Sequence, residues 1–283
     1  MQRIPHDLPA WVAELTDPRR ARTPDELADR LVPLAEHAID VSRRLQGLLA
    51  ELNEPFKRES LYERVERLRA RADEALAEVS AEIAASGRER VERIHAACAE
   101  RAAPRAGELR ARLEEEVGPL IARQERSVAD RVQARSATAL DEAVQEMLAR
   151  VEELATAVTD LIHAVLPLAR EGLELAGRIS AVSGRARAAA RGAVPPELAE
   201  EAAAVAAAFD EAVVRLELEW AALGSRSATV RAALRAAEET AFSQVTTAMT
   251  RCVEELAPGH AVALGEAEAR AMTLLEELTR VPE

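Results

Sequence analysis

The sequence predicts an all-α protein, an elongated helical bundle with coiled-coil character. Apolar residues make up 48% of the 283 residues but aromatic residues only 2%, so the core is built mainly from aliphatic side chains and alanine, which favour closely packed helices. Apolar residues recur at alternating spacings of three and four over long stretches, which is the period of a helix seam. No run of useful length alternates apolar and polar residues as a half-buried strand would.

The first predicted helix follows an N-terminal arm, residues 1–22. Thr23 is suited to cap the helix, Pro24 fits the first helical position, and Glu26 completes a capping box. The Asn-Glu-Pro sequence at 53–55 is expected to end this helix, because proline cannot continue the hydrogen-bond ladder.

A long antiparallel hairpin is predicted next, so that residues 23–182 form one bundle. Pro104 is expected to kink or divide its first arm, and Gly118-Pro119 is the strongest turn signal between the arms. The apolar stripe of the first arm is Leu61, Val65, Leu68, Ala72, Ala75, Val79, Ile83, Gly87, Val91, Ile94 and Cys98.

The second arm carries the stripe that we predict to be an interaction surface. Its gaps alternate strictly between three and four, which favours coiled-coil packing. From 154 to 169 the only charge is Asp160, so this helix needs cover on more than one side. Other helices of the chain, a second copy or lipid are the three candidates for that cover. The stripe is Val144, Met147, Val151, Leu154, Val158, Leu161, Val165 and Leu168.

A linker at 183–196 is predicted to precede a C-terminal unit of three shorter helices, residues 197–283. The linker holds small residues, three arginines and Pro195-Pro196. The helices are expected at about 197–223, 226–257 and 261–280, with turns at Gly224-Ser225 and Pro258-Gly259. Residues 196–283 carry a net charge of −9 and residues 1–195 carry −4, so the two parts differ in electrostatic character.

Charge and cysteine content restrict the expected partners and compartment. A net charge of −13 opposes non-specific binding to nucleic acid and to anionic lipid, so we expect no nucleic-acid partner and no membrane. Two cysteines form no disulfide framework, and the N-terminus has no apolar run of signal-peptide length. These features favour a cytoplasmic protein in a reducing compartment.

The sequence contains no recognised catalytic motif. It has no glycine-rich phosphate loop, no nucleophile elbow and no zinc-protease motif. Cys98 has His95 one turn away, but its place on the apolar stripe is typical of a buried structural cysteine. We therefore expect neither a cofactor nor an enzyme.

Two short motifs have the spacing of a metal-carboxylate bundle. Glu92 with His95, and Asp160 with His163, are each three residues apart and so share a helix face. About one such pair is expected by chance in a chain this rich in acidic residues. The favoured interpretation is that His95 flanks the apolar stripe and His163 packs in a mostly apolar helix with a hydrogen-bond partner. These residues are weak metal candidates.

The sequence therefore favours a self-associating helical scaffold or adaptor, whose partner is a second copy or another helical protein. The first alternative is an amphipathic-helix protein that coats a lipid or granule surface. The second is a metal-carboxylate bundle enzyme.

Overall fold

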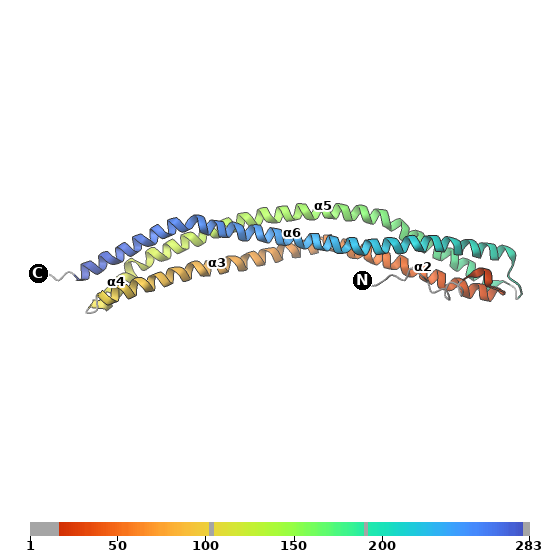
Figure 1. Cartoon of the computed structure of the whole chain (residues 1–283), viewed down its shortest axis with the longest axis horizontal. Helices are drawn as coiled ribbons and strands as arrows, with labels where there is room; N and C mark the ends of the chain where they lie inside the picture. Colours follow the sequence, from red (N-terminus) through yellow and green to blue (C-terminus); the bar gives the residue numbers. More distant parts are fainter. Residues whose placement is uncertain (1–16, 102–104, 190–191, 280–283) are drawn as a thin grey trace. The chain divides into compact units, whose positions relative to one another are not determined.

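The computed structural model describes residues 17–101, 105–189 and 192–279, and it confirms the all-α fold (Figure 1). The described residues form helices joined by short turns and contain no strand. In chain order the elements are η1 (Pro18–Arg20), α2 (Pro24–Asn53), η2 (Glu54–Phe56), α3 (Arg58–Arg101), α4 (Ala106–Glu116), α5 (Gly118–Ala188) and α6 (Pro196–Thr279).

The start and end of α2 agree with the sequence prediction. The side-chain oxygen of Thr23 accepts a hydrogen bond from the backbone N–H of Glu26 at 3.2 Å. The Glu26 carboxylate reaches back to the N–H of Arg22 at 2.8 Å, one residue before the position expected in a capping box. The helix ends at Asn53, directly before the η2 turn. Of the predicted arm, residues 1–16 lie outside the described residues.

The chain divides into two compact units, each assembled from segments far apart in sequence. Unit 1 comprises Met1–Ser60 and Glu152–Leu234, and unit 2 comprises Leu61–Val151 and Arg235–Glu283. Helices α5 and α6 contribute to both units, because each contains residues on both sides of a boundary. This grouping follows packing, whereas the sequence-based division at 183–196 follows chain order.

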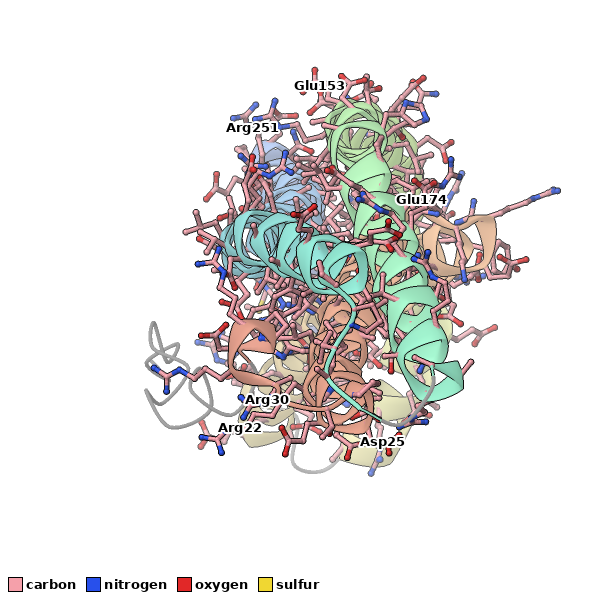
Figure 2. The ribbon with its side chains drawn as sticks, turned by 90° about the vertical axis from the view of Figure 1, so that its right-hand side faces the viewer. Arg22, Asp25, Arg30, Glu153, Glu174 and Arg251 are labelled. Carbon is pink, nitrogen blue, oxygen red and sulfur yellow. The ribbon has the colours of Figure 1, made fainter. Side chains whose placement is uncertain are left out.

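Unit 1 packs α2 against the second part of α5 and the first part of α6. Its core near Val194 contains Leu31, Ile179 and Phe209, one from each helix. A second core contains Leu45, Val165 and Leu223, again one from each. Charged side chains such as Glu153 and Glu174 of α5 are exposed and point away from the helices (Figure 2). Each helix therefore buries one apolar stripe and exposes the opposite face to solvent.

Unit 2 contains the predicted antiparallel hairpin, formed by α3 with α4 and the first part of α5. Leu68 of α3 packs with Met147 of α5 and Val245 of α6 in one core. Ile94 of α3 packs with Leu113 of α4 in the other. All stripe positions predicted on α3 are buried or half-buried. Pro104 lies outside the described residues, but α3 ends at Arg101 and α4 begins at Ala106.

The turn predicted at Gly118-Pro119 is wrong. Val117 donates its N–H to the carbonyl of Leu113 at 3.0 Å and accepts from the N–H of Ile121 at 3.2 Å, so helical hydrogen bonding continues from α4 into α5. Pro119 lies in the first turn of α5, where its missing N–H costs little. The chain instead reverses direction between the end of α3 and the start of α4, in the interval where the sequence has Pro104 (Figure 1).

The three C-terminal helices predicted from sequence are one helix, α6, of 84 residues. Gly224-Ser225 and Pro258-Gly259 lie within it on exposed positions. Solvent can hydrate the carbonyl that loses its partner at Pro258, while the buried stripe continues through Leu223 and Leu264. Pro167 likewise lies inside α5.

The predicted linker at 183–196 is partly helix and partly core. Ser183 is buried on α5 and donates its hydroxyl to the carbonyl of Ala28 on α2 at 3.2 Å. Ala186 is fully buried in the core of unit 1. The described part of the loop begins after Ala188 and includes Gly192, whose φ of +150° is a conformation that favours glycine.

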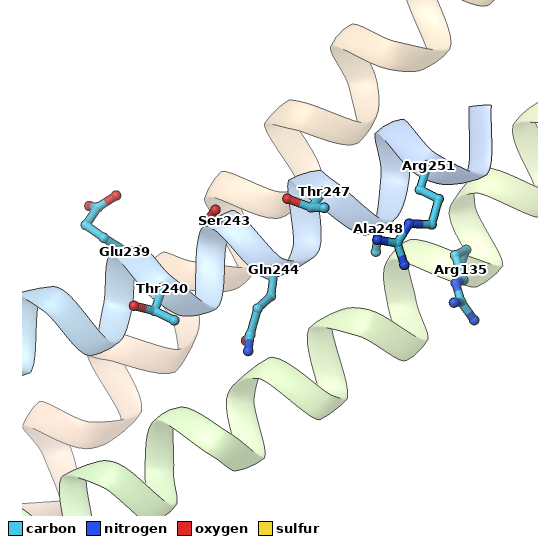
Figure 3. A pocket seen from close by; sticks show the side chains of 8 residues that line it. All are labelled: Arg135, Glu239, Thr240, Ser243, Gln244, Thr247, Ala248 and Arg251. Carbon is cyan, nitrogen blue, oxygen red and sulfur yellow. The ribbon is translucent and has the colours of Figure 1, made fainter. Parts of the chain in front are cut away.

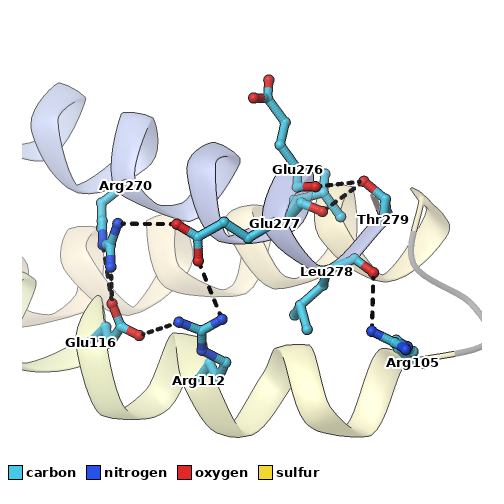
Figure 4. Close-up of polar contacts among 9 residues, drawn as sticks. Arg105, Arg112, Glu116, Arg270, Glu276, Glu277, Leu278 and Thr279 are labelled. Atoms are coloured by element: carbon cyan, nitrogen blue, oxygen red, sulfur yellow. Dashed lines mark hydrogen bonds and ion pairs between the residues drawn. The ribbon is translucent and has the colours of Figure 1, made fainter. Parts of the chain in front are cut away.

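A polar network joins α4 to the end of α6 in unit 2 (Figure 4). The Glu116 carboxylate accepts from Arg112 at 3.0 Å and from Nε of Arg270 at 3.0 Å. The hydrogen bond from Arg270 is the main reason that the pKa of Glu116 lies below its ordinary value. Arg105 donates to the carbonyl of Leu278 at 3.5 Å, which satisfies one of the free carbonyls at the end of α6.

Within the described residues, no helix combines the length and the apolar character needed to cross a membrane.

Candidate functional site

The stripe predicted as an interaction surface is largely packed inside the chain. Met147 joins the core of unit 2, where it meets α3 and α6. Val158 and Val165 join the core of unit 1 beside α2 and α6. The buried members are Met147, Val151, Val158 and Val165, and the half-buried members are Val144, Leu154, Leu161 and Leu168. The stripe therefore has little free surface to offer a partner.

The charge-poor part of α5, residues 154–169, is covered on one side only. Leu45 and Leu49 of α2 and Leu216 of α6 pack in the same core as its buried residues. Asp160 and His163 lie on the opposite side and are exposed. The chain itself thus covers the apolar side, and the residues exposed on the other side are small or polar.

The metal candidates do not form a site. Glu92 is exposed and His95 is half-buried in unit 2, while Asp160 and His163 are exposed in unit 1. Across the ranges that the structure describes, no group of three His, Cys, Asp or Glu side chains is arranged to hold a metal ion. Cys98 is buried in the core with Ile94, and burial raises the pKa of its thiol, which disfavours the reactive thiolate.

An apolar strip on α6 is the first candidate site that the structure adds. Val214 is 57% exposed and Leu218 is 55% exposed, although both are aliphatic residues in the middle of a helix. Small residues at helical spacing extend the same face in both directions, interrupted by Asp210 and Glu211 between Ala207 and Val214. We call this face the α6 strip; it comprises Ala207, Val214, Leu218, Ala221, Ser225, Ala228 and Ala232.

Opposite charges border the two halves of the α6 strip. Asp210 and Glu211 are exposed beside its N-terminal half, and Arg226 and Arg231 are exposed beside its C-terminal half. No ion pair links any of these four to another described residue, whereas nearby Arg215 already pairs with Glu171 of α5 at 3.0 Å. The strip is therefore an apolar surface with unpaired acidic residues beside one half and unpaired basic residues beside the other.

A polar groove in unit 2 is the second candidate site (Figure 3). It has a volume of about 530 Å³ and lies between α6 and Arg135 of α5. Two contacts hold the helices together here: Gln244 donates to the Glu146 carboxylate at 2.6 Å, and the Cys252 thiol lies 3.9 Å from the carbonyl oxygen of Arg131. The lining residues, which we call the Arg135–Arg251 groove, are Arg135, Glu239, Thr240, Ser243, Gln244, Thr247, Ala248 and Arg251.

The groove hydroxyls differ from their neighbours on the same helix. Thr246 and Thr250 do not line the groove, and their hydroxyls donate to carbonyls of their own helix at 3.0–3.2 Å. Thr240, Ser243 and Thr247 line the groove, and their hydroxyls have no hydrogen bond to any described residue. Their donors and acceptors are therefore available to a ligand.

The groove arginines have no acidic partner among the described residues. The only acidic lining residue, Glu239, is held by Arg71 through two hydrogen bonds of 2.9 and 3.1 Å. These hydrogen bonds lower the pKa of Glu239. Arg251 reaches from α6 toward the part of α5 that carries Arg135 (Figure 3). Arg135 and Arg251 are therefore two exposed guanidinium groups at one end of the groove, and neither forms an ion pair with a described carboxylate.

Sequence reasoning missed both sites for identifiable reasons. The uncharged run from Thr240 to Thr250 is visible in the sequence as the longest of its kind, but its partner Arg135 is more than a hundred residues away. The α6 strip contains mostly alanine, which periodicity assigns equally well to an exposed or a buried face. Only the packing of unit 1 shows that this face of α6 is exposed and not buried.

Comparisons with known proteins assign this chain to no family, since no family model, no curated protein and no solved structure matches it.

Proposed function

We propose that this protein is a self-associating helical scaffold or adaptor, and that a second copy of the chain docks on the α6 strip. The observation that carries the proposal is the exposure of Val214 and Leu218 on a face with small residues along it. Exposed aliphatic residues that adjoin on one face are a feature of association surfaces, whereas single ones are common everywhere. Self-association through the predicted α5 stripe is less favourable, because half of its members are already buried.

Size complementarity supports a second copy as the occupant. If two α6 helices pair antiparallel about a two-fold axis between Leu218 and Ala221, Val214 of one copy faces Ser225 of the other. Leu218 then faces Ala221. Larger aliphatic side chains thus pack into the space above small ones, which allows the helix axes to approach closely.

Charge complementarity supports the same antiparallel pairing. The acidic half of one strip, at Asp210 and Glu211, then lies within about one turn of Arg226 and Arg231 of the partner helix. None of these residues has an ion pair with another described residue, so none needs to break one. Parallel pairing would instead place like charges together, which is unfavourable.

Light scattering on a gel-filtration column tests the proposal. We expect a dimer at micromolar concentration and a monomer for Leu218→Asp, because a carboxylate in a helix seam is buried without a partner. The matched control is Val262→Asp, which puts the same charge on the same helix at a site 65% exposed in unit 2 and should leave the dimer intact. A wild-type monomer, or equal dissociation by both variants, would refute the proposal.

Charge reversal adds a test of the orientation. Arg226→Glu with Arg231→Glu is expected to weaken the dimer, and adding Asp210→Arg with Glu211→Arg is expected to restore it. Circular dichroism should be unchanged throughout, because all four positions are exposed. Failure of the restoring variant would contradict antiparallel pairing.

A further inference from the structure

We infer that the Arg135–Arg251 groove binds the phosphate group of a ligand. The inference is independent of the proposed self-association, since the groove lies in unit 2 and the α6 strip lies in unit 1. Its volume of about 530 Å³ exceeds that of a phosphate alone, so it also accommodates part of the molecule that carries the phosphate.

Charge is the first reason. The chain carries 50 acidic and 37 basic residues, so an exposed arginine has many potential partners. Arg71, Arg90 and Arg270, for example, each pair with a glutamate of another helix. Arg135 and Arg251 face the same groove and pair with no described carboxylate. Glu254 and Glu255, one turn beyond Arg251 on α6, form no ion pair with it. Two guanidiniums that line the same groove carry like charges, and an anion bound between them is attracted to both.

The hydroxyls are the second reason. Thr240, Ser243 and Thr247 share one face of α6 at spacings of three and four residues, and all three face the groove with their hydrogen bonds unused. A tetrahedral phosphate accepts hydrogen bonds from guanidinium and hydroxyl groups together, and arginine matches its geometry with two parallel donors. A carboxylate ligand would use fewer of these donors.

Because the chain is acidic overall, its attraction for phosphate is restricted to the groove itself. A net charge of −13 gives the chain no general attraction for anions, so binding of phosphate has to come from short-range contacts in the groove. The same reasoning disfavours nucleic acid, which requires an extended basic surface. Two arginines are enough to bind the one phosphate group of a small phosphorylated molecule.

The first arm of the test is isothermal titration calorimetry with inorganic phosphate and with pyrophosphate. The second arm is flotation on phosphatidylcholine vesicles that contain or lack phosphatidic acid. We expect saturable binding of pyrophosphate, or flotation that depends on phosphatidic acid; the arm that responds identifies a free or a lipid-borne phosphate. Removing a charge-assisted hydrogen bond commonly weakens binding by about tenfold to a hundredfold, so Arg135→Gln with Arg251→Gln is expected to weaken it by at least tenfold.

Matched controls separate a built site from general electrostatics. Arg123→Gln removes one exposed charge from the same helix about 18 Å before Arg135, and it should leave binding unchanged. Thr247→Val should weaken binding severalfold, whereas Thr246→Val, whose hydroxyl serves the helix backbone, should not. Circular dichroism checks that every variant keeps its helicity.

Binding in neither arm would overturn the inference, as would equal weakening by Arg123→Gln and the groove variants. Loss of dimerisation in Leu218→Asp with retained phosphate binding would show that the two proposals are separate.

Discussion

Gly172→Ala tests how closely the three helices of unit 1 approach one another. A Cβ placed on Gly172 of α5 would lie 2.2 Å from Oγ of Ser42 on α2 and 2.8 Å from Cδ1 of Leu216 on α6. Both separations are well inside the roughly 3.5–4.0 Å of normal carbon contacts. Ser42 and Leu216 are buried, so neither side chain has open solvent to move into.

Two opposing effects set the magnitude. Overpacking a filled core costs about 1–3 kcal/mol. Replacing glycine by alanine inside a helix gains about 1 kcal/mol from helix propensity. The free energy of unfolding should therefore fall by about 0–2 kcal/mol, which makes a control necessary. Gly177→Ala supplies it: Gly177 lies on the same helix and is exposed, and a Cβ added there would meet nothing within 4 Å, so this variant should gain about 1 kcal/mol.

The difference between the two variants isolates the steric cost, about 1–3 kcal/mol. Urea denaturation in a Trp11→Phe background measures it, because Trp220 is then the only tryptophan. Trp220 packs against the same core as Leu216, so its fluorescence reports on unit 1. Adding Ser42→Ala to Gly172→Ala should recover part of the loss, since it removes the nearest clashing atom. Equal midpoints for Gly172→Ala and Gly177→Ala would refute the close approach.

Three further predictions concern burial, helix continuity and lipid. Glu125→Gln should stabilise the protein at neutral pH, because burial raises the pKa of Glu125 and so penalises its carboxylate form in the folded state. Thermal melts should show that this gain in stability shrinks as the pH falls through the raised pKa. Gly224→Ala should stabilise by about 1 kcal/mol if α6 is continuous there, whereas a turn with positive φ would make it destabilising. Neutral liposomes should neither float the protein nor raise its helicity in circular dichroism; a clear gain in both would instead favour the lipid-coating alternative.

Local signals in the sequence identified the helices themselves. Thr23 caps α2 and the 53–55 sequence ends it, because caps and proline act on hydrogen bonds within a few residues. The stripe on α3 faces the interior, because its period fixes which residues share a helix face whatever the partner is. The antiparallel pairing of α3 with α5 followed from two adjacent long stripes.

Tertiary packing alone decided where the chain turns and which faces remain exposed. Gly224 and Pro258 cost about 1 and 3 kcal/mol in a helix interior, yet α6 continues through both. A chain break there would expose the apolar stripe that Leu223, Val245 and Leu264 bury along α6, and each buried aliphatic side chain contributes about 1.5–3 kcal/mol. The same competition left Val214 and Leu218 exposed, since the described residues of unit 1 form three α-helices and no fourth that covers that face. Periodicity shows which apolar residues share a helix face, but only packing determines whether another helix covers that face.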